Sequence, residues 1–138
     1  MKKNVSERRL VDVLVSFLRP RNYVERGLRH YEKTIDVVAV CLESGELSAI
    51  EAKTKNWRRA VEQAIVNLAA AERSYIAIYS NFAHRVSLEE LDRHGIGLIS
   101  VGSQWGDVEV IKEADLSPFV NLLMNKRIKD KLLPKGAK

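Results

Sequence analysis

Two runs rich in Val and Ile, residues 34–42 and 47–54, are separated by only the four residues 43–46, which include a glycine. β-branched residues favour strands, and a short polar segment with glycine favours a tight turn. The pattern therefore predicts an antiparallel β-hairpin. A chain with this hairpin must build a sheet, and the surrounding helical patterns must cover that sheet.

The hairpin is expected to gather charged side chains on one face. A turn centred on Ser44 and Gly45 places Asp36 opposite Lys53. Residues opposite one another share a face of a sheet, as do residues two apart on one strand, so Glu51 joins this pair. The rest of that face is apolar. Two carboxylates in such a place need a cation, and both can bind one Mg²⁺ ion, while a neighbouring lysine can activate water or offset charge on a phosphate.

The remaining elements follow from the spacing of apolar residues and from helix-capping signals. The period of the apolar residues predicts helices and strands in the order α, β, β-hairpin, α, β, α, β, β, α. The expected bounds are a helix over 5–18, a strand over 22–26, the hairpin over 34–54, a helix from 57 to about 72, a strand over 75–79, a helix over 88–95, a strand over 97–101, an edge strand over 107–111 and a final helix that begins at Ser117 and Pro118. This order predicts an α/β fold in one domain over residues 1–138, with a basic C-terminal helix and tail from about residue 118.

Several classes of protein are excluded by what the sequence lacks. It contains no run of 18 apolar residues and no signal-peptide pattern, so we expect a cytoplasmic protein with no membrane partner. Its single cysteine, Cys41, cannot form an internal disulfide or supply a cysteine-rich zinc site.

The charge is distributed unevenly along the chain. There are 23 basic and 18 acidic residues, and two basic regions, residues 1–59 and 126–138, flank an acidic middle. Basic groups at Arg58 and Arg59, in the first turn of the expected second helix, oppose the helix dipole, and an anionic partner would relieve that cost. DNA is the expected partner. The expected nucleic-acid contacts are Lys55, Arg58, Arg59, Lys126, Arg127, Lys129 and Lys131.

Asp36 followed by Glu51, Ala52 and Lys53 resembles the PD-(D/E)xK signature of the restriction-endonuclease-like nuclease superfamily. The order of elements over residues 5–101 is also similar to that of the superfamily. The size of the chain is similar to that of small archaeal Holliday-junction resolvases. One position differs, since Ile35 stands where the signature has proline. The resemblance implies a restriction-endonuclease-like three-layer α/β/α sandwich with a central mixed β-sheet. It also implies a Mg²⁺-dependent DNA endonuclease, with Mn²⁺ as a substitute and no small-molecule cofactor.

The resemblance also implies roles for individual residues. Asp36, Glu51 and the backbone carbonyl of Ala52 would hold the metal, and Lys53 would orient the attacking water. Gln63 and Glu7 would support the metal or the water, and the spacing of Glu7 places it on the buried face of the first helix. In a purely structural interpretation, Asn4 is the N-cap of the first helix and Glu7 is its capping-box partner, while Gln63 is a solvated helix residue.

Two questions stay open at this stage. Asp36, Glu51 and Lys53 could form structural ion pairs, in which case the protein is an inactive nucleic-acid-binding or assembly module on the same fold. If it is a nuclease, 138 residues leave no room for a separate recognition domain, which favours junction or branched DNA or a partner that directs cutting. Cutting two strands needs two active sites, so we expect a homodimer that meets through the final helix and the edge strand at 107–111.

Overall fold

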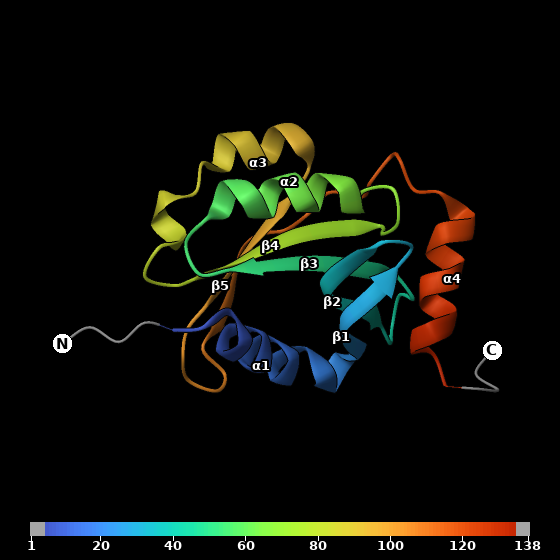
Figure 1. Ribbon diagram of the computed structural model, residues 1–138, viewed down its shortest axis with the longest axis horizontal. Helices are drawn as coiled ribbons and strands as arrows, with labels where there is room; N and C mark the ends of the chain where they lie inside the picture. Colours follow the sequence, from blue (N-terminus) through green and yellow to red (C-terminus); the bar gives the residue numbers. More distant parts are fainter. Residues whose placement is uncertain (1–4, 135–138) are drawn as a thin grey trace.

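A six-stranded sheet with the order β1-β2-β3-β4-β5-β6 forms the centre of the molecule (Figure 1). The computed structural model describes residues 5–134. Its strands are β1 (Asn22–His30), β2 (Lys33–Cys41), β3 (Leu47–Lys53), β4 (Arg73–Tyr79), β5 (Gly97–Val101) and β6 (Val108–Lys112). β4 lies parallel to both β3 and β5, and the other neighbouring strands are antiparallel. The predicted mixed sheet is confirmed.

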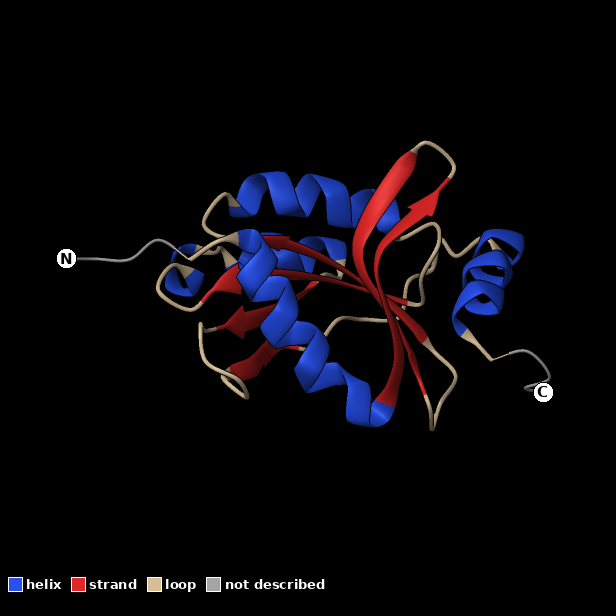
Figure 2. Cartoon of the chain, turned by 60° about the horizontal axis from the view of Figure 1, so that its bottom comes forward, coloured by secondary structure: helices blue, strands red, loops and turns tan. Residues whose placement is uncertain are grey.

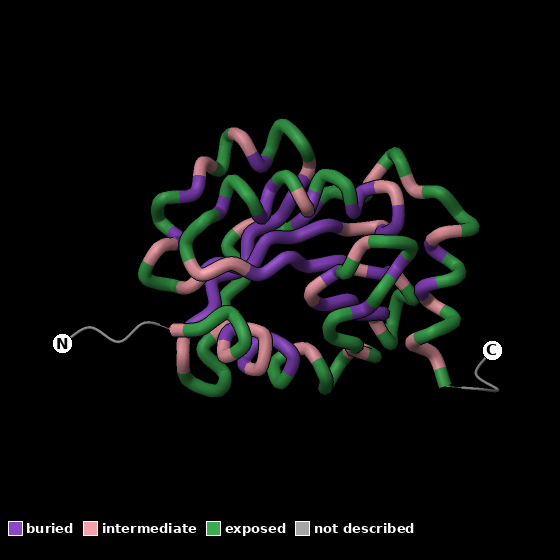
Figure 3. The backbone as a smooth tube through the Cα atoms, in the orientation of Figure 1, coloured by how far each residue is buried: buried purple, intermediate pink, exposed green. Residues whose placement is uncertain are grey.

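Helices cover both faces of this sheet. The helices are α1 (Glu7–Leu18), α2 (Trp57–Asn67), α3 (Leu88–His94) and α4 (Leu122–Leu132), with short 3₁₀ turns η1 (Arg19–Arg21) and η2 (Ala83–Arg85). α1 lies below the sheet and α2 and α3 lie above it in Figure 1, whereas α4 packs at one end against β1 and β2. Burial is concentrated in the strands between these layers (Figure 3). The predicted three-layer α/β/α sandwich is confirmed.

Side chains along β3 alternate between the two layers. Ile50 and Ala52 pack with α1, against Leu10 and Leu14. Glu51, which lies between them, contacts α2 instead. The strand period thus places one carboxylate of the predicted site in the layer between the sheet and α2.

Three element bounds differ from those predicted by about four residues or more, and the others by one or two. β1 continues past Arg26 to His30, through Gly27, whose φ is +62°. α2 ends at Asn67 rather than near residue 72, because tight backbone turns follow it. The final helix begins at Leu122 rather than at Ser117, because the hydroxyl of Ser117 donates to the carbonyl of Leu68 and fixes that segment outside the helix.

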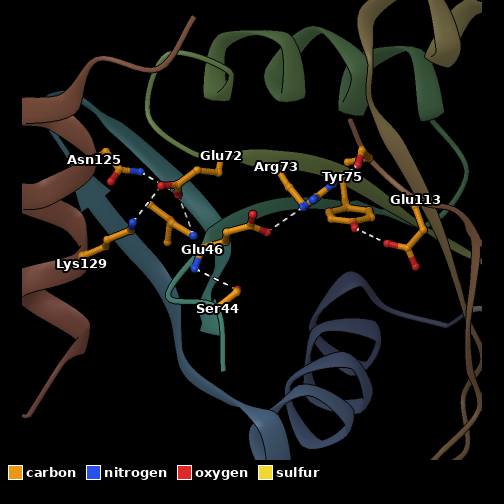
Figure 4. A network of polar contacts seen from close by, with 10 residues as sticks. Ser44, Glu46, Glu72, Arg73, Tyr75, Glu113, Asn125 and Lys129 are labelled. Carbon is orange, nitrogen blue, oxygen red and sulfur yellow. Dashed lines mark hydrogen bonds and ion pairs between the residues drawn. The ribbon is translucent and has the colours of Figure 1, made fainter. Parts of the chain in front are cut away.

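A polar network fastens α4 to the rest of the domain. Figure 4 shows the Glu72 carboxylate accepting hydrogen bonds from Asn125 Nδ2 (2.9 Å) and Lys129 Nζ (2.8 Å) of α4, in addition to the backbone N–H of Leu47 (2.8 Å). Burial opposes the charge, yet these donors hold the pKa of the Glu72 carboxyl below its usual value. Lys129 is therefore engaged inside the protein.

The elements expected to form a dimer contact lie at the surface. β6 is an edge strand of the sheet, and Phe119, Leu122 and Leu123 are exposed. Met124 is partly buried. The homodimer itself stays a prediction.

None of the helices within residues 5–134 combines the length and the apolar composition that crossing a bilayer requires.

Candidate active site

The β2–β3 hairpin has a different register from the predicted one. Its last hydrogen bond before the loop runs from the N–H of Cys41 to the carbonyl of Glu46, so the turn is centred one residue earlier than predicted. Val37 pairs with Ile50, and the same register places Asp36 opposite Glu51. The predicted pairing of Asp36 with Lys53 is therefore wrong. A shift of two positions preserves the face, so the carboxylates still lie on the same side of the hairpin.

The Asp36 carboxylate lies in the fork where β2 and β3 separate. In a continued ladder, the N–H of Ala52 would donate to the carbonyl of Ile35. Instead it donates to Oδ2 of Asp36, at 2.9 Å. The side chain thus replaces main-chain pairing at this position. Asp36 is fixed by the backbone of the strand that carries Glu51.

Glu51 is completely buried. Its Oε2 accepts a hydrogen bond of 2.8 Å from Asn67 Nδ2, at the end of α2. Burial raises the pKa of the Glu51 carboxyl to about 7, and the nearby Asp36 adds to the rise, while Asn67 and Lys33 oppose it. A carboxylate buried beside a second carboxylate is stabilised when a cation binds between them.

Three buried oxygens of this region accept no hydrogen bond. They are Oε1 of Glu51, Oε1 of Gln63 and Oδ1 of Asn67. Gln63 and Asn67 lie one helical turn apart on α2, and therefore on the same face of that helix. Buried acceptors normally find a donor, and carboxylate and amide oxygens are the ligands that Mg²⁺ prefers. These oxygen atoms are therefore suitable ligands for a hard divalent cation.

The number of acidic groups at this place is small. Within residues 5–134, no three or more His, Cys, Asp or Glu side chains form a group that could hold a metal ion. A cation here would therefore bind two carboxylates, Asp36 and Glu51, and complete its coordination with amide or backbone oxygens and water. Such an arrangement leaves positions open for a substrate.

A cleft of about 580 Å³ gives access to Asp36. It lies between the start of β2 and the exposed side of α2, and residues from both elements line it: Glu32, Lys33, Thr34, Asp36, Arg59, Glu62, Gln63 and Val66. The predicted site residue Gln63 therefore lines the same cleft as Asp36. Lys33 and Arg59 supply positive charge at its walls.

Lys53 and Glu7 lie together at the carboxyl end of β3. Nζ of Lys53 is 3.8 Å from a carboxylate oxygen of Glu7. Glu7 is half exposed, so its predicted place on the buried face of α1 is wrong. The reason is its position at the very start of the helix, directly after the N-cap Ser6. The alternative cap, Asn4, lies outside the described residues.

The predicted nucleic-acid residues fall into two groups. At the start of α2, Arg58 packs over the Trp57 ring at 4.4 Å and Arg59 pairs with Glu62 at 3.1 Å, while Lys55 lies 6.0 Å from the Phe82 ring. In α4, Lys126 pairs with Asp130, and Lys129 is held by Glu72. The side chains of Arg127 and Lys131 bind the β1–β2 hairpin. α4 thus offers fewer free cations than its sequence indicates.

Sequence reasoning missed Asn67 and Lys33. The spacing of Asn67, four residues after Gln63, could have revealed it as a neighbour on the same helix face. No sequence motif marks Lys33, which comes three residues before Asp36 at the start of β2 and lines the same cleft.

Comparison with known proteins gives a likeness of fold. No protein-family model matches the chain, and neither does any curated protein. The chain is similar to the structure of a protein of unknown function from Silicibacter pomeroyi, with a TM-score of 0.72 and 19% identity over 95% of this chain and 86% of that one. It is also similar to a repair endonuclease from Pyrococcus abyssi, with a TM-score of 0.50 and 14% identity over 75% of this chain. The match spans 50% of that endonuclease.

Proposed function

We propose that this protein is a divalent-metal-dependent endonuclease that hydrolyses DNA phosphodiester bonds. The observation that carries the proposal is the fork between β2 and β3, where Asp36 and the buried Glu51 lie together beside amide oxygens that lack donors. The order of Asp36, Glu51 and Lys53, which resembles PD-(D/E)xK, supports it. The fold-level likeness to a repair endonuclease supports it further.

Each group would have a distinct chemical task. Asp36, Glu51 and the carbonyl of Ala52 would hold Mg²⁺ or Mn²⁺, with Gln63 in support. The metal would polarise the scissile phosphate and lower the pKa of a bound water. Lys53 would orient that water and offset charge that develops on the phosphate. Glu7 would hold Lys53 in place until the substrate arrives.

Removing the Asp36 charge should abolish divalent-cation binding. Asp36→Ala removes one of two carboxylates, and Asp36→Asn removes only the charge while it retains an oxygen for the N–H of Ala52. Calorimetric titration with Mn²⁺ should detect one site in the wild type and none in either variant. The control is Glu89→Ala, which removes an exposed carboxylate on α3. Equal Mn²⁺ affinity in the wild type and Asp36→Asn would refute the site and favour the inactive binding module.

Losing a phosphate contact at the start of α2 should weaken the salt dependence of DNA binding. Arg58→Ala and Arg59→Ala should each lower the slope of log affinity against log salt concentration by about 0.9 for duplex DNA. Fluorescence anisotropy over a range of KCl concentrations measures the slope. Arg93→Ala, which removes an exposed cation from α3, is the matched control. A slope unchanged by the α2 variants would exclude this end of the helix from the DNA interface.

A further inference from the structure

The turn of the β1–β2 hairpin contains an unusual residue. His30 pairs with Lys33, which leaves Tyr31 and Glu32 as a two-residue turn. Tyr31 has a φ of +58° and is the only non-glycine residue within 5–134 with a positive φ. Hairpin turns that need this conformation normally use glycine, asparagine or aspartate. An aromatic residue here is strained, and such strain is often kept where it serves ligand binding.

The Tyr31 ring is exposed but held in a fixed orientation. Its exposed fraction is 62%, yet the ring packs on buried His30 with the ring centroids 4.6 Å apart. Its hydroxyl accepts a hydrogen bond of 3.1 Å from Arg127 of α4. Lys131 of α4 donates to the carbonyl of Arg29 in the same hairpin. Figure 2 shows this hairpin rising out of the sheet on the side of the molecule where α4 lies. The hydrogen bonds from Arg127 and Lys131 connect its tip with α4.

The tip adjoins the candidate active site. Glu32, Lys33 and Thr34, which follow Tyr31 directly, line the cleft that contains Asp36. Tyr31 and Asp36 are five positions apart along the chain, so their Cα atoms are at most about 17 Å apart. This distance corresponds to about five stacked nucleotides at 3.4 Å each.

The surroundings of the ring are cationic. Arg29, Lys33, Arg127 and Lys131 lie on the hairpin tip or on the part of α4 that contacts it, and Glu32 is the one acidic residue in the turn. An exposed aromatic ring among cations is the arrangement by which proteins bind unpaired nucleotides, since bases stack on the ring and phosphates meet the cations. A fully paired duplex offers no free base face to this ring.

We propose that Tyr31 stacks on an unpaired base of DNA that occupies the cleft, so that the preferred substrate class is DNA in which a paired and an unpaired segment meet. This inference rests on the proposed function. It also gives α4 a role, because Arg127 and Lys131 hold the Tyr31 ring and the hairpin that carries it, here called the platform, in place.

Two variants of Tyr31 distinguish the contribution of the aromatic ring from that of the turn conformation. Tyr31→Asn removes the ring and places a residue that tolerates positive φ, so the turn should keep its conformation. Relief of the backbone strain opposes the loss of the contacts with His30 and Arg127, and the melting temperature should stay within a few degrees of the wild type. Tyr31→Phe keeps the ring and loses the hydroxyl. Binding is measured in EDTA with a duplex that carries one unpaired nucleotide and with the fully paired duplex of the same sequence. Tyr31→Asn should weaken binding of the bulged DNA about tenfold and change duplex binding less than twofold, and Tyr31→Phe should keep the preference.

Binding without metal and cleavage with Mn²⁺ test the Tyr31 stacking and the nuclease activity separately. The inference is overturned by a wild type with no preference for bulged DNA, or by a Tyr31→Asn variant that keeps the preference or loses both DNAs equally. If the wild type shows the preference through Tyr31 but cuts neither DNA with Mn²⁺, the platform stands and the nuclease proposal fails. If it cuts both DNAs at equal rates in wild type and variant, the nuclease proposal stands and the platform fails.

Discussion

Replacing Lys53 with alanine should reduce DNA cleavage by at least about 100-fold and leave DNA affinity within a factor of a few. The expected size is that for the loss of one group that stabilises charge in the transition state. Lys53 is partly buried beside Glu7 at the end of β3, so it contributes little to the outer surface that first meets DNA. Its charge matters most when the phosphate carries additional negative charge.

The matched controls test whether Lys53 acts through its charge or only through its pair with Glu7. Lys55→Ala removes an exposed lysine two residues later and should affect binding more than the rate. Glu7→Gln removes the partner of Lys53 and should cost much less activity than Lys53→Ala. Single-turnover cleavage with Mn²⁺, with the DNA affinity measured in parallel, separates rate from binding. Cleavage by Lys53→Ala at the wild-type rate would exclude the proposed mechanism.

The order of elements could be predicted because periodicity and capping are local properties. The Ser87 cap and the left-handed Gly95 bound α3 as expected, and β5 covers the predicted residues 97–101. The register of the hairpin could not be predicted, because residues 42–46 allow two turn centres that differ by one residue. Both centres place Asp36 and Glu51 on one face, so the shared face of the two carboxylates did not depend on which centre the turn adopts.

The details of the site depend on packing that no local pattern records. Asn67 meets Glu51 because α2 stops at that residue and crosses directly over β3. Glu7 follows the apolar spacing of α1 but lies beyond the edge of the core, where spacing no longer implies burial. Lys129 belongs to a basic run in the sequence and yet forms an ion pair with the partly buried Glu72. Charge runs predict surface cations only where no acidic residue lies beneath them.

Replacing Glu51 with glutamine should stabilise the metal-free protein above pH 7 and abolish its response to Mn²⁺. The pKa of Glu51 rises from 4.5 to about 7 on folding, chiefly because of burial. A carboxyl with a raised pKa stabilises the fold in its protonated form, so this contribution is complete below about pH 4.5 and is lost as the pH rises through about 7. The loss amounts to at most about 3 kcal/mol, at 1.36 kcal/mol for each unit of pKa.

Urea unfolding in EDTA at pH 5 and pH 8.5 measures this difference. The wild type should be less stable at pH 8.5 than at pH 5. The stability of Glu51→Gln should differ little between the two pH values, since the amide keeps an oxygen for Asn67 and carries no charge. Saturating Mn²⁺ should stabilise the wild type at pH 8.5 and leave the variant unchanged. Glu72→Gln provides the opposite control, because the lowered pKa of Glu72 stabilises the fold at high pH and its loss should destabilise the protein there. If Glu51→Gln is less stable than wild type at pH 8.5 without metal, Glu51 is a satisfied structural carboxylate, and the energetic reason for a cation in the β2–β3 fork disappears.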